Sequence, residues 1–216
     1  MDDFGAEDLI DCYANGVFPM AEGRDDPRIY LLDPDERGIL PLDGFHIPKS
    51  LRKTVRQDLY QVSVNERFEE VVEGCAAPAP GREDTWINSG ILRLYSELHR
   101  IGYAHSVECW AGGELVGGLY GVALGGAFFG ESMFSRRRDA SKVALVHLVA
   151  RLKAGGFVLL DTQFTTTHLE RFGAKTIRRD TYKSRLFQAL RIDADFMRLP
   201  RELSGAQALQ SSTQTS

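Results

Sequence analysis

The segment from Gly117 to Ala174 limits most strongly how this 216-residue chain can fold. Two short apolar runs, Leu115–Ala123 and Ala127–Ser132, are separated by Leu124-Gly125-Gly126. Apolar runs divided by two glycines are typical of a β-hairpin. The segment therefore predicts a pair of antiparallel strands at the centre of the fold.

A long helix and another strand should follow this hairpin. Asp139–Ala154 contains neither Gly nor Pro and predicts a helix, which Gly155-Gly156 should end. The apolar run Phe157–Leu160 then predicts a buried strand. That strand leads into Asp161-Thr162-Gln163, and the preceding hairpin ends near Glu131. Polar groups at the ends of adjacent buried strands indicate a functional site.

The rest of the chain predicts shorter elements around this centre. The helices are expected at Ala6–Gly16, Pro48–Gln57, Arg67–Cys75, Asn88–Arg100, Thr167–Phe172 and Asp180–Arg191, and the strands at Val17–Met20, Ile29–Leu32, Tyr60–Val64, Ala104–Trp110 and Lys175–Arg178. Asp33–Gly38 is expected to be a loop. Antiparallel strands followed by one helical crossover indicate a mixed sheet of the α+β class. This order suits an N-acyltransferase-like domain, in which the central strands part to admit an acyl donor.

Composition excludes several classes of protein. Hydrophobic residues make up 43% and charged residues 26%, as in ordinary globular proteins. No apolar run approaches the roughly 20 residues that a membrane span needs. The acidic start does not resemble a signal peptide, and the three cysteines are too widely spaced for a disulfide framework, so we expect a cytoplasmic location.

Charge favours only a local contact with nucleic acid. The net charge of −4 argues against general binding of polyanions. The densest basic cluster is Arg136-Arg137-Arg138, just before the long helix. Three arginines in a row are often only a solvated surface, but free N–H groups at a helix N-terminus also favour an anion. We expect this cluster to contact phosphates.

The polar side chains Glu131, Asp161 and Gln163 favour the positioning of an amine. Asp161 and Gln163 are two residues apart on one strand, so they should share a face. If Asp161 accepts from the Gln163 NH₂, the amide oxygen faces the cleft and can hold an amine N–H. An amide oxygen is hardly basic, which suits an amine whose pKa is already near 8, such as a protein N-terminus.

Other catalytic classes lack their usual patterns. The five histidines do not have metal-ligand spacing, and Ser132 does not lie in a Gly-x-Ser-x-Gly elbow. No Gly-x-Gly-x-x-Gly motif opens a helix after a strand. An acetyl-CoA-dependent enzyme should have a glycine-rich pyrophosphate loop where this chain has Ser135–Ser141, which lacks glycine. Metal, dinucleotide and coenzyme A are therefore disfavoured.

Several motifs together resemble the leucyl/phenylalanyl-tRNA–protein transferase family. They are Asn15–Pro19 (NGVFP), Leu40-Pro41, Glu83–Ile87 (EDTWI), Leu98–Arg100 (LHR), Gly117–Gly121 (GGLYG), Gly130–Ser135 (GESMFS), Ala140–Lys142 (ASK), Asp161–Gln163 (DTQ) and Phe172–Ala174 (FGA). They follow one another in order over nearly the whole chain, and the GESMFS block is highly specific.

This resemblance implies an enzyme that moves Leu or Phe, and less well Met, from its tRNA to proteins beginning with Arg or Lys. Such transfer marks the acceptor for N-end-rule degradation, and it uses no metal or coenzyme. The resemblance implies a small N-terminal lobe and a GNAT-like domain. It also implies that Glu131, Asp161 and Gln163 are catalytic, and that an aminoacyl-adenosine pocket is lined by Tyr13, Trp86, Tyr95, Phe128, Met133 and Leu160. The partners would be the 3′ end and acceptor stem of aminoacyl-tRNA and the acceptor protein.

Three residues differ from the family pattern, and two other functions stay open. Met20 and Leu31 stand where Trp is common, which affects the expected adenine-stacking surface, and Arg178 stands where Pro is common. We expect a lobe at residues 1–42, a catalytic domain at 43–200 and a disordered tail at 201–216. The alternatives are a coenzyme A-dependent or peptidoglycan-type acyltransferase, and a tRNA- or degron-binding module without activity.

Overall fold

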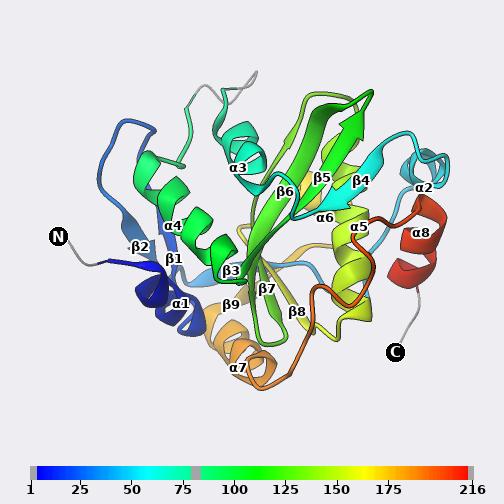
Figure 1. Cartoon of the computed structure of the whole chain (residues 1–216). Coiled ribbons are helices and arrows are strands. Elements are labelled where there is room, and N and C mark those ends of the chain that lie inside the picture. The colour runs from blue at the N-terminus through cyan, green and yellow to red at the C-terminus, as the bar shows by residue number, and fades with distance from the viewer. Residues whose placement is uncertain (1–3, 79–83, 214–216) are drawn as a thin grey trace.

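The predicted hairpin, long helix and following strand lie together at the centre of the fold (Figure 1). The structure, a computed structural model, describes residues 4–78 and 84–213. Its helices are α1 Ala6–Ala14, α2 Lys49–Arg56, α3 Phe68–Ala76, α4 Ser89–Arg100, α5 Ala140–Ala154, α6 Thr167–Glu170, α7 Arg179–Ala189 and α8 Gly205–Thr213. Its strands are β1 Phe18–Met20, β2 Tyr30–Leu32, β3 Glu36–Ile39, β4 Gln61–Val64, β5 Ala104–Ala111, β6 Glu114–Leu124, β7 Ala127–Ser135, β8 Leu159–Gln163 and β9 Lys175–Arg178.

The described strands form a mixed seven-stranded sheet in the order β4-β5-β6-β7-β8-β3-β9, together with the small β1-β2 pair. Neighbours are antiparallel except β7 and β8, which α5 connects as a crossover. Strand pairing between β7 and β8 ends at Phe129 and Asp161, although both strands continue. The central strands therefore part as expected, and the predicted α+β fold with a small N-terminal part is confirmed.

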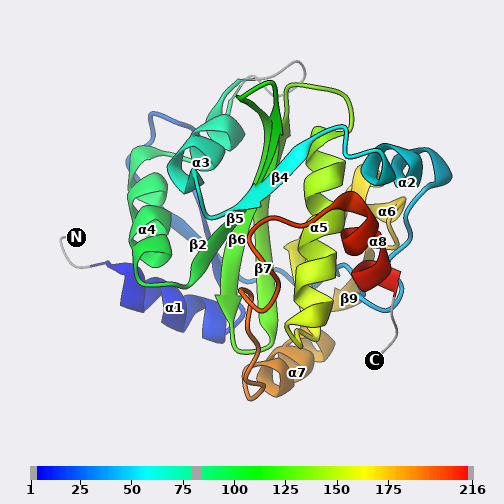
Figure 2. The same ribbon diagram turned by 45° about the vertical axis from the view of Figure 1, so that its right-hand side comes forward.

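Helices cover both faces of this sheet (Figure 2). Helices α1, α3 and α4 pack on one face, where Tyr13, Tyr95 and Phe129 belong to one hydrophobic core. Helix α5 crosses the other face with α2 and α8 beside it, over a second core that contains Phe128 and Leu148. The side chain of Asn88 caps α4, because its oxygen accepts from the Ile91 N–H at 2.8 Å. This cap confirms the expected start of that helix.

Strand β3 corrects the prediction of a loop at Asp33–Gly38. Glu36-Arg37-Gly38 has neither β-branched residues nor an apolar alternation, so nothing local indicates a strand. Pairing with β8 on one side and β9 on the other imposes the extended conformation. A Cβ at Gly38 would lie 2.5 Å from the carbonyl carbon of Phe164, so only glycine lets these backbones meet. The strand carries Arg37 into the protein interior, where it is 1% exposed.

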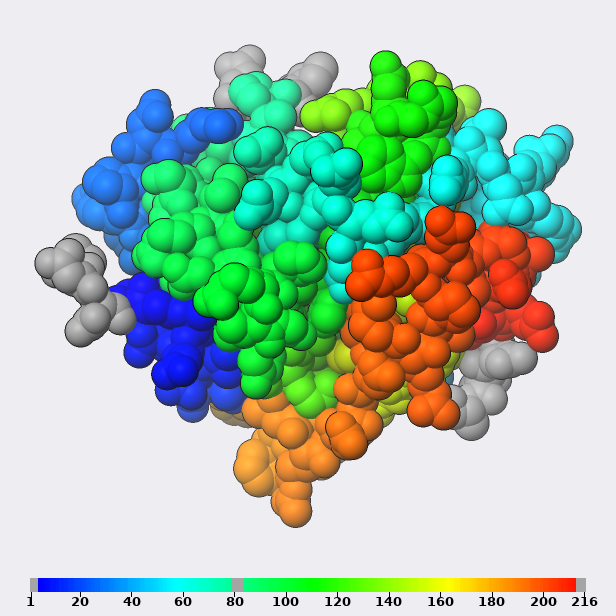
Figure 3. Space-filling model, in the orientation of Figure 1, coloured from blue at the N-terminus to red at the C-terminus, as the bar shows by residue number. Residues whose placement is uncertain are grey.

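The C-terminal segment and the start of β8 also differ from expectation. Part of the predicted disordered tail is helical: α8 packs on α5 and buries Ala208 and Leu209, and residues 214–216 of that tail lie outside the described residues. In Figure 3 the orange and red surface of this end of the chain lies beside the cyan residues of α2. Few apolar residues suffice here because a neighbouring helix covers them. Strand β8 begins at Leu159, and Val158 before it is 57% exposed, so the run from Phe157 is not buried throughout.

The division into lobe, catalytic domain and tail at residues 42 and 200 stays a prediction.

Within the described ranges, no helix has the length and hydropathy needed to cross a bilayer.

Candidate active site

An apolar pocket of about 310 Å³ opens where β7 and β8 part. Its lining residues come from β1, β6, β7, α5, β8 and α6 and from the segment before α4. They are Phe18, Pro19, Met20, Trp86, Leu119, Tyr120, Gly130–Met133, Leu145, Leu148, Leu160, Thr162–Phe164, Thr166, His168 and Leu169. Most of these side chains are apolar, and Glu131 and Gln163 stand at the wall. The pocket therefore offers an apolar compartment with the carboxyl group of Glu131 and the amide of Gln163 at its wall.

A β-bulge places Glu131 at this wall. Along β6 and β7, Gly121 pairs with Gly130 but Tyr120 pairs with Ser132, which leaves Glu131 as the extra residue. A Cβ at Gly121 would collide with the Phe129 carbonyl oxygen, so glycine allows the close approach of the strands here. The bulge turns the carboxyl group of Glu131 toward the pocket and toward the tyrosines of α1 and α4.

The Glu131 carboxyl group forms a closed set of contacts with two buried tyrosines. Tyr13 donates to Oε1 and Tyr95 donates to Oε2, each at 2.7 Å, and the two hydroxyls lie 2.6 Å apart. Three oxygen–oxygen contacts need three hydrogens, and the tyrosines supply two. A protonated Glu131 supplies the third: it then donates to one tyrosine hydroxyl, and that tyrosine donates to the other. This geometry thus favours a protonated carboxyl group.

The electrostatic surroundings agree with this proton count. Burial raises the pKa of Glu131 to about 7, although the hydrogen bonds from Tyr13 and Tyr95 lower it. The negative charge of Asp161 adds to the rise. Burial, followed by the charge of Glu131, also raises the pKa of both tyrosines, which therefore stay neutral donors. Glu131 can accordingly change its charge near neutral pH.

We expect Glu131 to make stability depend on pH. Because its pKa is higher in the folded than in the unfolded chain, it stabilises most below about pH 4.5 and loses this contribution as pH rises through about 7. A shift of this size corresponds to about 3 kcal/mol. Urea denaturation of wild type and Glu131→Gln from pH 5 to 8 measures the difference between them. The variant should gain stability relative to wild type as pH rises; a difference independent of pH would contradict the raised pKa.

Gln163 contributes its amide from the end of β8, in a rare backbone conformation. Its φ is +54°, a left-handed value that is uncommon outside glycine. One amide orientation donates to Glu131 Oε1 at 3.3 Å but leaves the amide oxygen facing two backbone carbonyls. The reverse orientation donates to the carbonyl oxygens of Gly130 at 2.8 Å and Thr162 at 3.2 Å. We assign the second, which turns the amide oxygen toward Glu131.

Asp161 does not hold the Gln163 side chain, contrary to the sequence-based prediction. It is fully buried behind the pocket, and its Oδ1 accepts the backbone N–H of Gln163 at 2.8 Å. Arg37 and the hydroxyl of Tyr182 occupy its remaining acceptor positions. The left-handed conformation of Gln163 turns its side chain away from Asp161, and strand periodicity alone could not indicate this turn.

The predicted lining residues fall into three groups. Trp86, Met133 and Leu160 line the pocket. Tyr13 and Tyr95 lie behind Glu131 and do not line the pocket. They contact the carboxyl group of Glu131, which does. Phe128 is not among the lining residues, because its ring lies farther along the α5 side of β7, where it packs on Phe157 and Phe196.

The arginine cluster lies outside the pocket lining and is not uniform. Arg136 donates to the Leu115 carbonyl and covers the Phe134 ring. Arg137 pairs loosely with Glu114 at the surface, and the side chain of Arg138 is 93% exposed. Two of the three arginines can therefore reach a partner. The described part of the chain contains no group of His, Cys, Asp or Glu side chains arranged to hold a metal ion.

Sequence analysis missed several residues of the site. Phe18 and Phe164 line it and stack edge to face at 5.7 Å. The hydroxyls of Tyr120 and Thr162 also belong to the lining, are buried, and have no hydrogen-bond partner among the described residues. Tyr120 lies in the GGLYG motif, the one signal that could have indicated it.

A mixed sheet whose parallel strands part around an apolar pocket is typical of N-acyltransferase-type proteins. Residues 39–187 match the family model described as leucyl/phenylalanyl-tRNA protein transferase, and residues 2–35 match the model for the N-terminal domain of the same transferase. The chain belongs to this family and is an aminoacyltransferase.

Curated relatives carry the same description over the full chain. A leucyl/phenylalanyl-tRNA–protein transferase of Maricaulis maris is 75% identical, and the alignment covers 99% of both chains. The proteins of Caulobacter vibrioides and Phenylobacterium zucineum with this name are 60% and 58% identical, with all of each chain aligned.

Proposed function

We propose that the chain transfers Leu or Phe, and less well Met, from aminoacyl-tRNA to the N-terminal amine of proteins that begin with Arg or Lys. The product would be marked for N-end-rule degradation, and the reaction would take place in the cytoplasm. The observation that carries this proposal is a carboxyl group with a pKa of about 7 at the wall of an apolar pocket. The names of the relatives supply the donor and the kind of acceptor.

The donor side chain would occupy the apolar compartment. Met133, Leu160 and Leu148 offer it a surface without charge, which suits Leu, Phe and Met. The ester between the amino acid and the terminal ribose would lie at the mouth, beside Gln163. Discrimination would come from shape, and one misplaced methyl group costs only about 1–3 kcal/mol in such a pocket.

The acceptor would place its first side chain on Glu131. Before the acceptor binds, the carboxyl group would exchange between its neutral and charged forms near pH 7, in contact with the two tyrosine hydroxyls. A guanidinium or ammonium group would stabilise the carboxylate, so that binding would release the proton. An acidic first residue would meet repulsion instead. The carboxyl group would thus select Arg and Lys by charge.

The reaction then needs orientation more than proton abstraction. The nitrogen of the neutral α-amine attacks the ester carbonyl carbon, an amide bond forms, and the ribose oxygen leaves. The amine loses one proton and the ribose oxygen gains one. The amide oxygen of Gln163 would accept an N–H bond and hold the amine in line with the ester. Fixing two reactants in this way accounts for a large part of the acceleration in transfer reactions.

The alternative functions predict different donors and acceptors. A coenzyme A-dependent enzyme needs backbone N–H groups around a pyrophosphate, and the segment before α5 contains Ser135 to Asp139 without glycine. A binding module would retain tRNA or an N-terminal Arg but transfer nothing. The test is to incubate the protein with an Arg-initiated peptide and either Leu-tRNA or acetyl-CoA, and to measure the peptide mass. We expect one added leucine; an acetyl adduct or an unchanged peptide would contradict the proposal.

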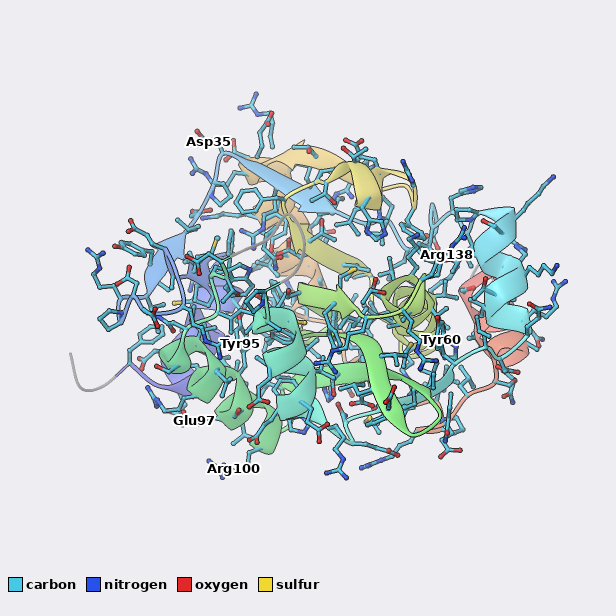
Figure 4. All side chains as sticks on the ribbon, turned by 90° about the horizontal axis from the view of Figure 1, so that it is seen from above. Asp35, Tyr60, Tyr95, Glu97, Arg100 and Arg138 are labelled. Carbon is cyan, nitrogen blue, oxygen red and sulfur yellow. The ribbon has the colours of Figure 1, made fainter. Side chains whose placement is uncertain are left out.

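The tRNA body would contact a basic surface next to α5. Helix α2 carries Lys49, Arg52, Lys53 and Arg56. The Tyr60 hydroxyl donates to the Arg138 carbonyl oxygen at 2.7 Å, which ties the arginine cluster to the strand after α2. Figure 4 shows Arg138 on the α2 side of the molecule and Arg100 far from it. Phosphate contacts at this surface would orient the donor without reading its sequence.

Replacing Arg137 and Arg138 by Ala should therefore weaken donor binding. Each lost phosphate contact should reduce the slope of log Kd against log salt by about 1. Turnover at saturating donor should change little. The control pair, Arg93→Ala with Arg100→Ala on α4, should leave the slope unchanged. A collapse of turnover with unchanged donor affinity would instead place the cluster in the reaction itself.

A further inference from the structure

Arg37 is buried behind the pocket, where its guanidinium group is paired with the carboxylate of Asp161. Its Nε lies 3.0 Å from Asp161 Oδ1 and its Nη2 lies 2.7 Å from Oδ2, so the two side chains form a two-pronged ion pair. Its Nη1 donates to the Gly16 carbonyl oxygen at 2.7 Å. The guanidinium carbon lies 4.4 Å from the ring centre of Phe18 and 4.5 Å from that of Tyr182. Arg37 therefore joins the N-terminal part, β8 and α7 at one point.

Asp161 connects Arg37 to the backbone of Gln163 through hydrogen bonds to its two carboxylate oxygens. Its Oδ2 also accepts the Tyr182 hydroxyl at 2.6 Å, while Oδ1 accepts the Gln163 N–H at 2.8 Å. With a guanidinium against both oxygens, the carboxylate cannot serve as a free base. A carboxylate that accepts the N–H two residues later stabilises a turn at that point. The left-handed backbone of Gln163 is strained and persists only where the surroundings hold it.

We propose that Arg37 is a positioning residue for aminoacyl transfer: by holding Asp161, it fixes the left-handed backbone of Gln163 and so aims the Gln163 amide at the acceptor amine. The same guanidinium also holds Gly16 and Phe18. The kinetic part of this proposal rests on the proposed function. The conformational part rests on geometry alone.

A purely structural ion pair would behave differently from a positioning residue. Loss of a structural pair lowers the folded fraction and leaves the folded molecules with normal kinetics. Loss of positioning lowers the single-turnover rate of folded molecules, while the KM of the donor and of the acceptor stays the same. A displacement of about 1 Å in a reacting geometry can cost about 100-fold in rate.

The test uses two variants of the anchor and one matched control. Arg37→Lys retains the charge but loses the two-pronged geometry, and Tyr182→Phe removes only a hydroxyl. Arg151 is an equally buried arginine, 1% exposed, which is not among the pocket-lining residues and donates to backbone carbonyls of residues 199–201. Arg151→Lys therefore measures the general effect of losing a buried guanidinium. Circular dichroism and urea denaturation establish the folded fraction of each protein.

Single-turnover transfer from Leu-tRNA to an Arg-initiated peptide should fall about 100-fold in Arg37→Lys and about tenfold in Tyr182→Phe, with both KM values preserved. Arg151→Lys should lose stability and keep its rate. Wild-type rates in folded Arg37→Lys and Tyr182→Phe would overturn the proposal.

A second readout does not depend on activity. Hydrogen exchange of the Gln163 amide should rise about tenfold in both anchor variants, compared with the Ala123 amide, which donates to the Tyr103 carbonyl oxygen within the scaffold. Unchanged exchange at Gln163 would overturn the conformational part. If the wild type transfers nothing, the proposed function fails, and the exchange measurement still decides whether Arg37 holds Gln163.

Discussion

Replacing Glu131 by Gln should lower kcat/KM for an Arg-initiated peptide by about 100-fold, because truncating one member of a buried charge pair costs about 2–5 kcal/mol. The amide keeps the size of the side chain and can still bond to Tyr13 and Tyr95. It cannot become negative, so an incoming guanidinium gains no partner for its charge. The loss should appear mainly in the KM of the acceptor, since the ester and the amine are untouched.

A peptide beginning with citrulline provides the matched substrate, because citrulline has nearly the shape of arginine without its charge. Wild type should prefer Arg over citrulline by about 100-fold, and Glu131→Gln should treat the two alike within about threefold. Steady-state kinetics of wild type and Glu131→Gln with the Arg and citrulline peptides give four values of kcat/KM. Together they form a thermodynamic cycle that isolates the interaction between Glu131 and the charge of the first residue. An undiminished preference for Arg in the variant would mean that another group binds the charged side chain of the acceptor.

Glu131→Gln should also be more stable than wild type at pH 8, a common relation for residues kept for function.

Replacing Gln163 by Glu should reduce single-turnover transfer by about 100-fold at pH 8, because the new carboxylate would face the carbonyl oxygens of Gly130 and Thr162 and the carboxyl group of Glu131. The two carbonyl oxygens cannot donate a hydrogen bond to it, and Glu131 can donate only while it holds a proton. A buried charge without a donor costs about 3 kcal/mol or more. Two carboxyl groups this close should also share one proton, so the pair titrates jointly.

The pH dependence of this variant separates positioning from base catalysis. If Gln163 orients the amine, the variant should recover relative to wild type as pH falls from 9 to 6 and its carboxyl group becomes protonated. If proton abstraction limits the reaction, a carboxylate should help. A variant as active as wild type at pH 8, with a new acidic limb near pH 6, would refute the positioning role. Single-turnover transfer to an Arg-initiated peptide from pH 6 to 9 gives the profile.

Local patterns in the sequence predicted much of the fold. The glycines at 125 and 126 marked the hairpin, Asn88 marked the start of α4, and the glycines at 155 and 156 marked the end of α5. These features act over a few residues, so a single sequence carries them. The crossover from β7 to β8 followed from the order of the elements, and with it the place of the gap between the strands.

Long-range contacts were beyond such reasoning. Arg37 lies in a segment without strand propensity, and only its two partner strands make it part of the sheet. The bulge at Glu131 depends on how closely β6 and β7 meet at Gly121. The left-handed turn at Gln163 depends on Asp161, which Arg37 holds. The site residues were therefore predicted as a set, while their mutual contacts required the three-dimensional arrangement.

Phe128 illustrates the same limit within one strand. It belongs to the apolar run that predicted β7, and strand alternation puts it on the α5 side, against Phe196. The bulge at Glu131 shifts the alternation so that Met133 also faces α5, and Met133 lines the pocket, whereas Phe128 lies nearer the β6–β7 turn against Phe157. An extra residue in a strand leaves no clear signal in composition.

The most direct test of transfer in this pocket is the ratio of Phe to Leu transferred when the compartment changes size. Met133→Phe should narrow the pocket and Met133→Ala should widen it, while Glu131 and Gln163 stay in place. With equal amounts of Leu-tRNA and Phe-tRNA and an Arg-initiated peptide, mass spectrometry measures both products in one reaction, so a partly unfolded variant leaves the ratio unaffected. The ratio of Phe to Leu should fall about tenfold in Met133→Phe and rise in Met133→Ala, as expected for discrimination by shape. A ratio equal to that of wild type in both variants would mean that the aminoacyl group does not bind in this pocket.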